Sequence, residues 1–184
     1  MYKRIVCFDF DGTLINTPTP ELGRGEWEKA TGMQWPGRGW WGSAESLNTN
    51  IFYPPVNGWV YKFYEKYIND PETYCFLATG RLHRLERQVL DVLNLHGITF
   101  TPSEDNPKGV YCNTGGETYK FKTWLFEQKI KQFPSAEEFI MFDDRHEHLV
   151  KFEDWANDQP IPVRIVDVIN KKEFKTNKNL HNII

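Results

Sequence analysis

Two aspartates, Asp9 and Asp11, end an apolar run near the start of the chain, in the segment RIVCFDFDGT. Side chains alternate between faces in an extended chain, so both carboxylates point one way while Phe8 and Phe10 point the other. Two neighbouring anions need a cation, and oxygen ligands suit a hard divalent ion such as Mg²⁺. Taken alone, the pair fits a solvated acidic strand end equally well.

Three further segments place chemically competent residues at the ends of predicted elements. ATGR puts Thr79 where a hydroxyl can hold a phosphoryl oxygen, although a helix cap is the alternative. Lys122 begins a predicted helix, where the helix dipole favours anions, so a cation there indicates an anionic partner. Two alternatives stay open: Lys122 is simply solvated, or Lys120 is the functional lysine in its place. EFIMFDDR repeats the opening pattern with Asp143 and Asp144, which strengthens the prediction of a Mg²⁺ site.

Alternating strands and helices must position these residues. Apolar and β-branched runs predict strands at 3–10, 73–79, 98–101, 138–142 and 162–169. Helical periodicity and stop residues predict helices at 60–67, 82–96, 122–133 and 147–156. This order predicts an α/β fold, a Rossmann-like three-layer sandwich with a mostly parallel central sheet. In such folds ligands bind beyond the carboxyl ends of the strands.

The chain of 184 residues predicts one domain over 1–168 and a polar tail over 169–184. Residues 15–60, rich in Trp, Gly and Pro, are predicted to form a small cap-like insertion after the first strand.

The predicted insertion carries aromatic rings that can stack on nucleic acid bases, among them Trp40 and Trp41. Arg24 and Arg38 can add phosphate contacts. A small satellite core that merely covers the site is the alternative, since aromatic side chains bury large areas.

Composition sets the broad class. A hydrophobic content of 40% and a charged content of 26% predict a globular protein, and a net charge of -3 gives no reason to expect nucleic acid binding from charge alone. The three cysteines fit reduced core thiols, and neither a leader nor a membrane-length apolar run is present, so we expect a cytoplasmic protein without a membrane partner. His146 and His148 lack the spacing of a zinc site.

In these segments the sequence resembles the haloacid dehalogenase (HAD) superfamily of phosphatases. The motifs of that superfamily are DxDGT, a Thr or Ser at the second strand end, a Lys and an acid pair, and all occur here in order. TPTP, GRGWWGSAESLN, ATGR, TYKFKTWL and FDDRHEH further resemble its Swiss Army Knife RNA-repair group, over nearly the whole chain up to about residue 168.

The resemblance implies a role for each motif residue. Asp9 would be the nucleophile that forms an aspartyl-phosphate, and Asp11 the general acid and base. Thr79 and Lys122 would stabilise the phosphoryl oxygens. Mg²⁺ would be held by Asp9, Asp11 (through its carbonyl), Asp143 and Asp144. The residues expected to contact substrate are Thr13, Gly80, Arg81, Trp40 and Trp41.

The function implied is a Mg²⁺-dependent phosphomonoesterase acting on nucleic acid ends or on nucleotides. A phosphatase of small metabolites is the nearest alternative, and a catalytically silent module that binds phosphate or nucleic acid is an alternative of another class. The module would have no use for an acid and base at Asp11. We expect a monomer, and because no kinase or ligase domain fits in the chain, partner repair enzymes would supply those steps.

Overall fold

The computed structural model describes residues 1–37 and 39–175, so Arg38 and residues 176–184 of the predicted tail lie outside the described residues. The sheet has six strands in the order β3-β2-β1-β4-β5-β6. The strands are β1 (Arg4–Phe8), β2 (Thr73–Leu82), β3 (Val110–Asn113), β4 (Glu138–Asp143), β5 (Val163–Asp167) and β6 (Lys172–Lys175). All pairs from β3 to β5 are parallel, which confirms the α/β prediction.

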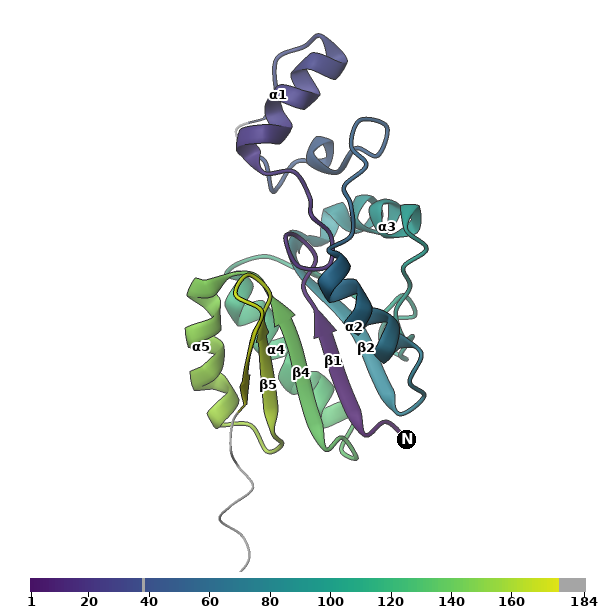
Figure 1. Ribbon diagram of the computed structural model, residues 1–184, viewed down its shortest axis with the longest axis vertical. Helices are drawn as coiled ribbons and strands as arrows, with labels where there is room; N and C mark the ends of the chain where they lie inside the picture. Colours follow the sequence, from purple (N-terminus) through teal and green to yellow (C-terminus); the bar gives the residue numbers. More distant parts are fainter. Residues whose placement is uncertain (38, 176–184) are drawn as a thin grey trace, which may run out of the picture.

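Helices cover both faces of the sheet (Figure 1). Buried side chains of α2 (Gly58–Ile68) and α3 (Glu86–Leu95) form one core with Val6 and Phe8 of β1. Those of α4 (Thr118–Gln132) and α5 (His146–Asn157) form the other core with Ile5 and Cys7. Side chains of β1 therefore alternate between two hydrophobic layers, as the sandwich requires. None of the described helices is long and apolar enough to cross a membrane.

Residues 16–57, here called the cap, follow β1 and hold α1 (Pro20–Thr31) and the short 3₁₀ helix η1 (Ala44–Leu47). Figure 1 shows α1 projecting past the carboxyl ends of the strands. The cap has a small core of its own, made by Trp27, Trp40 and Phe52 with Trp35 and Ile51 against them.

The two neighbouring tryptophans of the cap have different environments. Trp40 is 2% exposed, and its indole N–H donates to the Pro18 carbonyl at 2.8 Å. The predicted contact between Trp40 and substrate therefore disagrees with the structure, because Trp40 belongs to the satellite core. Trp41 is 46% exposed and stays accessible.

Three sequence-based predictions of local structure differ from the structure. The strand expected at 98–101 is absent, because β3 takes the place beside β2 while Ile98 and Phe100 pack into the core beside it. The polar tail expected from residue 169 contains β6, which pairs antiparallel with β5 at the edge of the sheet. A second 3₁₀ helix, η2 (His83–Leu85), also precedes α3, so the helix predicted from residue 82 begins later.

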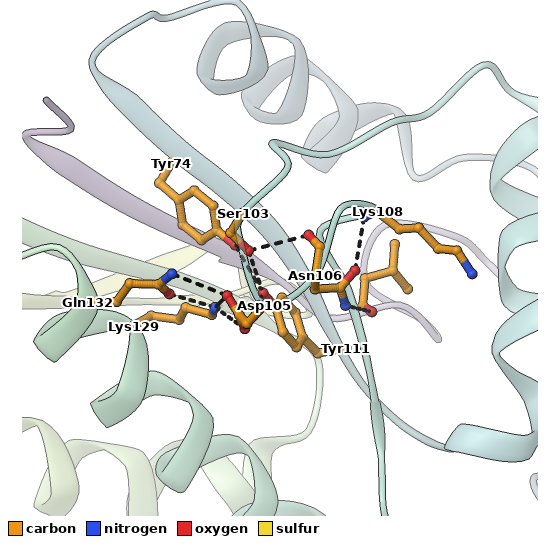
Figure 2. A network of polar contacts seen from close by, with 9 residues as sticks. Tyr74, Ser103, Asp105, Asn106, Lys108, Tyr111, Lys129 and Gln132 are labelled. Carbon is orange, nitrogen blue, oxygen red and sulfur yellow. Dashed lines mark hydrogen bonds and ion pairs between the residues drawn. The ribbon is translucent and has the colours of Figure 1, made fainter.

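The buried side chain of Lys129 in α4 binds Asp105 of the loop before β3 (Figure 2). Lys129 Nζ donates to both carboxylate oxygens of Asp105, at 2.9 and 2.7 Å, and to Gln132 at 2.8 Å. The same ammonium lies 4.5 Å from the ring centroid of Tyr111. Burial lowers the pKa of Lys129, although Asp105 opposes that shift. All three ammonium donors are used, so this cluster serves to hold the loop in place.

Candidate active site

The carboxyl ends of β1 and β4 bring two aspartates together. The strands pair in parallel with Phe8 opposite Phe142, so Asp9 and Asp143 continue two adjacent strands at the same edge of the sheet. The Asp9 N–H donates to the Phe142 carbonyl at 3.0 Å, which fixes the backbone there. Asp9 is 1% exposed and Asp143 is 0% exposed. Two carboxylates are thus held out of water, where charge is costly unless it is paired.

Lys122 of α4 supplies the pairing charge. Its ammonium donates to Asp9 Oδ1 at 2.6 Å and to Asp143 Oδ2 at 2.7 Å, and the side chain is 1% exposed. Lys120 instead has a side chain that is 80% exposed and lies 3.6 Å from Glu117. Of the two lysines considered from the sequence, the structure brings Lys122 to the acids.

A third carboxylate completes a candidate metal centre. Side-chain oxygens of Asp9, Asp143 and Asp144 all lie within 4.8 Å of one another. The Thr13 hydroxyl lies 3.4 Å from both Asp9 Oδ2 and Asp144 Oδ1. Gly12 allows this approach: its φ is +70°, and a β-carbon there would run into the Asp144 carboxylate.

The charges of this cluster call for a further cation. Burial raises the pKa of Asp9 to about 7, with Asp143 and Asp144 adding to the shift against the effect of Lys122. Burial likewise raises the pKa of Asp144 to about 6, with help from Asp143. Burial alone would lower the pKa of Lys122, but Asp143 and Asp9 raise it above its usual value. Three carboxylates against the ammonium of Lys122 and the nearby charge of Arg145 leave excess negative charge, so the donor set fits Mg²⁺, which takes oxygen ligands.

The Asp11 side chain points to different partners. Its carboxylate accepts from Arg81 Nε and Nη2, both at 2.8 Å, and from the Thr17 hydroxyl at 2.6 Å. The forked geometry suits a guanidinium, which can bind both oxygens of one carboxylate at once. Asp11 is not in the carboxylate cluster, so a Mg²⁺ contact from this residue would come from its backbone carbonyl.

Arg81, expected from the sequence to contact substrate, also ties the cap to the sheet. Its Nη1 donates to the Trp41 carbonyl at 2.8 Å and to the Ser46 hydroxyl at 2.7 Å. The guanidinium carbon lies 4.9 Å from the centroid of the Trp41 ring. Arg81 is 2% exposed. One buried cation therefore joins Asp11 to two residues of the cap.

A pocket of about 430 Å³ opens between the cap and the strand ends. It is lined by Asp11, Gly12, Thr17, Thr19, Trp41, Gly80, Arg81, Thr118, Asp144 and Arg145. Of the residues predicted to contact substrate, Gly80, Arg81 and Trp41 lie here. Thr79 is fully buried, and its hydroxyl accepts from the Arg81 N–H at 3.1 Å. No described contact joins Thr79 to the carboxylates.

Five pocket residues were not among the predicted site residues: Gly12, Thr17, Thr19, Thr118 and Arg145. The sequence signals were weak: Thr118 is the first residue of α4, four positions before Lys122, and Arg145 directly follows the acid pair. Neither position reveals which way its side chain points.

The comparisons with known proteins give one match. The family model described as HAD domain family 1 in Swiss Army Knife RNA repair proteins matches residues 31–181. That range includes Lys122 and Asp143 but begins after Asp9 and Asp11. The assignment of Asp9 and Asp11 to the site therefore rests on the contacts described above, not on the family match. Comparison with curated proteins and with solved structures gave no match.

Proposed function

The chain belongs to HAD domain family 1 of Swiss Army Knife RNA repair proteins, and from that premise we propose that it is a Mg²⁺-dependent phosphomonoesterase acting on nucleic acid ends or nucleotides. The observation that carries the proposal is the buried ammonium of Lys122 between Asp9 and Asp143. Burying three charged groups costs free energy of desolvation, which makes a purely structural role for the cluster unfavourable. Carboxylates with shifted pKa values are also concentrated at catalytic sites.

Asp9 is the proposed nucleophile. One of its carboxylate oxygens attacks phosphorus in line, a bond forms between them, and the bond from phosphorus to the substrate oxygen breaks. The Lys122 ammonium, which already touches Asp9 Oδ1 at 2.6 Å, lies where it can stabilise the oxygens of the transferring group. Water then attacks the aspartyl-phosphate, releasing inorganic phosphate and restoring Asp9.

Asp9, Asp143 and Asp144 are the side chains that would hold Mg²⁺. When bound, the ion supplies positive charge that offsets these carboxylates and the phosphoryl group. Asp143 is also fixed from behind, because its Oδ1 accepts from the Arg145 N–H at 3.0 Å.

Asp11 is the proposed general acid and base. It donates a proton to the leaving alkoxide in the first step and takes one from water in the second. Arg81 donates to both carboxylate oxygens of Asp11 here, so at least one of these hydrogen bonds must break before Asp11 can reach the leaving oxygen. The cap shares Arg81, so we propose that substrate entry beneath the cap accompanies this change.

The family description supports nucleic acid ends as the substrate class, since it names RNA repair. The pocket supports it too, because the exposed ring of Trp41 borders the space next to Asp11 and can stack on a base.

The proposal is tested by phosphate release from a 3′-phosphorylated oligonucleotide, a 5′-phosphorylated oligonucleotide, nucleoside monophosphates and a panel of phosphorylated metabolites. Each is measured with Mg²⁺ and with a chelator. We expect release from one oligonucleotide end or from nucleotides, with Mg²⁺ only. Release confined to the metabolites would move the assignment to a small-molecule phosphatase. No release from any of them would overturn the enzymatic proposal and favour a binding module.

Arg81→Lys is expected to lower kcat/KM about 10- to 100-fold. A lysine has one ammonium in place of the forked guanidinium and cannot hold Asp11, Trp41 and Ser46 together. Each charge-assisted hydrogen bond is worth roughly 1.5–3 kcal/mol, which corresponds to this range of rates. The variant should also be cleaved faster within the cap by limited proteolysis.

The matched control is Arg84→Lys. Arg84 donates to the Gly42 carbonyl of the same cap segment at 3.0 Å but is exposed, and no described contact joins it to Asp11. Equal losses in the two variants would show that Arg81 acts only by tethering the cap.

A further inference from the structure

We propose that Arg145 and Thr118 form a second anion-binding subsite in the pocket, so that the preferred substrate carries another phosphate besides the one that is removed. The inference rests on the proposed function and narrows its substrate class. It arises from a difference between the two arginines that line the pocket.

The guanidinium of Arg145 has unused donors. Among the described residues it makes no hydrogen bond and no close ion pair, although its charge acts on Asp9 and Asp144 and opposes the rise of their pKa values. Arg81 instead uses its Nε, Nη1 and Nη2 on Asp11 and the cap. The hydrogen bonds of Arg145 within the described residues are made by its backbone N–H and carbonyl. Its side chain is exposed, and it lines the same pocket as Asp11 and Asp144. Arg145 is thus a cation that faces the pocket and is available to a ligand.

The space next to Gly80 is bordered by two unused hydrogen-bond donors, the Thr118 hydroxyl and the Arg145 guanidinium. A β-carbon on Gly80 would lie 2.8 Å from Thr118 Oγ1 and 2.9 Å from Arg145 Nη2. The hydroxyl of Thr118, the first residue of α4, and the guanidinium of Arg145, the residue before α5, therefore lie next to the same backbone position. In the described part of the chain the Thr118 hydroxyl, like the Arg145 guanidinium, has no hydrogen-bond partner. A single oxyanion can accept from both groups, and phosphate matches the guanidinium well.

The donors of the subsite differ from Lys122, which is proposed to stabilise the reacting phosphoryl group, although the pocket also borders Asp144 of the carboxylate cluster. Lys122 donates to Asp9 and Asp143 and does not line the pocket. A pocket of about 430 Å³ lies within the size range of small-ligand sites, which is roughly 300–1,000 Å³. Because Asp144 of the carboxylate cluster also lines this pocket, a nucleotide unit bound in it can present one phosphate toward that cluster and another to Arg145. Such a unit is found at the end of a polynucleotide and in a free nucleoside bisphosphate.

Binding to an Asp9→Asn protein tests the subsite without requiring turnover. The probes are thymidine 3′-monophosphate, thymidine 5′-monophosphate, thymidine 3′,5′-bisphosphate and a dinucleotide with one terminal phosphate, each titrated with Mg²⁺ by calorimetry. We expect the bisphosphate to bind at least about tenfold more tightly than the better monophosphate. Adding Arg145→Gln should remove most of that preference, and adding Thr118→Val should remove part of it.

Arg87→Gln in the same background is the matched control, because Arg87 is exposed on α3 and its loss changes the net charge equally. It should leave the preference intact. Equal affinity for mono- and bisphosphate would overturn the inference, and so would an equal loss for both ligands in Arg145→Gln, since Arg145 would then bind the reacting phosphate.

The dinucleotide result identifies the source of the second phosphate, and turnover by the wild type tests the proposed function independently of the subsite. A dinucleotide that shares the Arg145-dependent preference identifies a polynucleotide end, and a preference limited to the bisphosphate identifies a free nucleotide; both support the subsite. An Arg145-dependent preference in a chain whose wild type releases no phosphate supports the subsite and overturns the phosphatase. Turnover without any such preference supports the phosphatase and overturns the subsite.

Discussion

Asp9→Asn is expected to abolish phosphate release, with a loss of roughly 10⁴-fold or more, as is typical when a covalent nucleophile is removed. An amide cannot form the acyl phosphate that the mechanism requires, even though Asn fills nearly the same volume. The rate is measured at saturating Mg²⁺ on the substrate that the wild type cleaves best. A variant that kept a tenth of the wild-type rate would show that Asp9 is not the nucleophile.

The pH dependence of stability is expected to differ between the wild type and the Asp9→Asn variant. In a chelator, folded wild type keeps a proton on Asp9 up to about pH 7, whereas the unfolded chain releases it near the ordinary pKa of 3.8. The folded state binds more protons across this interval, so stability is lost as the pH rises through it. The melting temperature of the wild type should therefore fall more steeply between about pH 4 and pH 7 than that of the variant. Parallel profiles would contradict the raised pKa.

Lys122→Met is expected to destabilise the metal-free protein by about 3–5 kcal/mol, the usual result of removing one partner from a buried ion pair. The loss leaves Asp9 and Asp143 at 1% and 0% exposure without a cation between them. Urea unfolding in a chelator measures the change. Saturating Mg²⁺ should restore part of the stability, because the ion binds the same carboxylates, while phosphate release stays far below wild type.

Lys120→Met is the matched control for that experiment. It removes a lysine two positions away on the same helix, where the side chain is 80% exposed. Exposed substitutions of this kind usually change stability by less than roughly 0.5 kcal/mol. Equal effects of the two variants would refute the role assigned to Lys122 in balancing the acids.

The sequence predicted the parts of the site that follow from strand geometry. Asp9 and Asp143 each follow a continuous apolar run, and parallel pairing alone brings such positions together. Lys122 was singled out as a cation at the start of a helix predicted over 122–133, but α4 begins at Thr118, so Lys122 lies beyond the first turn and that reason does not hold. The fold class was equally accessible, because strands and helices alternate along the chain.

The remaining features depend on contacts between distant segments. No local pattern shows that Arg81 joins Asp11 to the cap, since its partners lie up to 70 residues away in sequence. Trp40 and Trp41 are adjacent and chemically identical, yet the cap core buries only the first. β3 was overlooked because its four residues lie between two loops, and β2 runs on past Thr79 through an irregularity that the sequence does not mark.

The stereochemistry at phosphorus tests the central claim most directly. The wild type is given a substrate whose terminal thiophosphate is made chiral with ¹⁸O, and the reaction is run with Mg²⁺ in water enriched in ¹⁷O. Each in-line displacement inverts phosphorus, so attack by Asp9 followed by attack by water predicts net retention. Net inversion would mean that water attacks the substrate directly, and it would contradict the covalent role of Asp9.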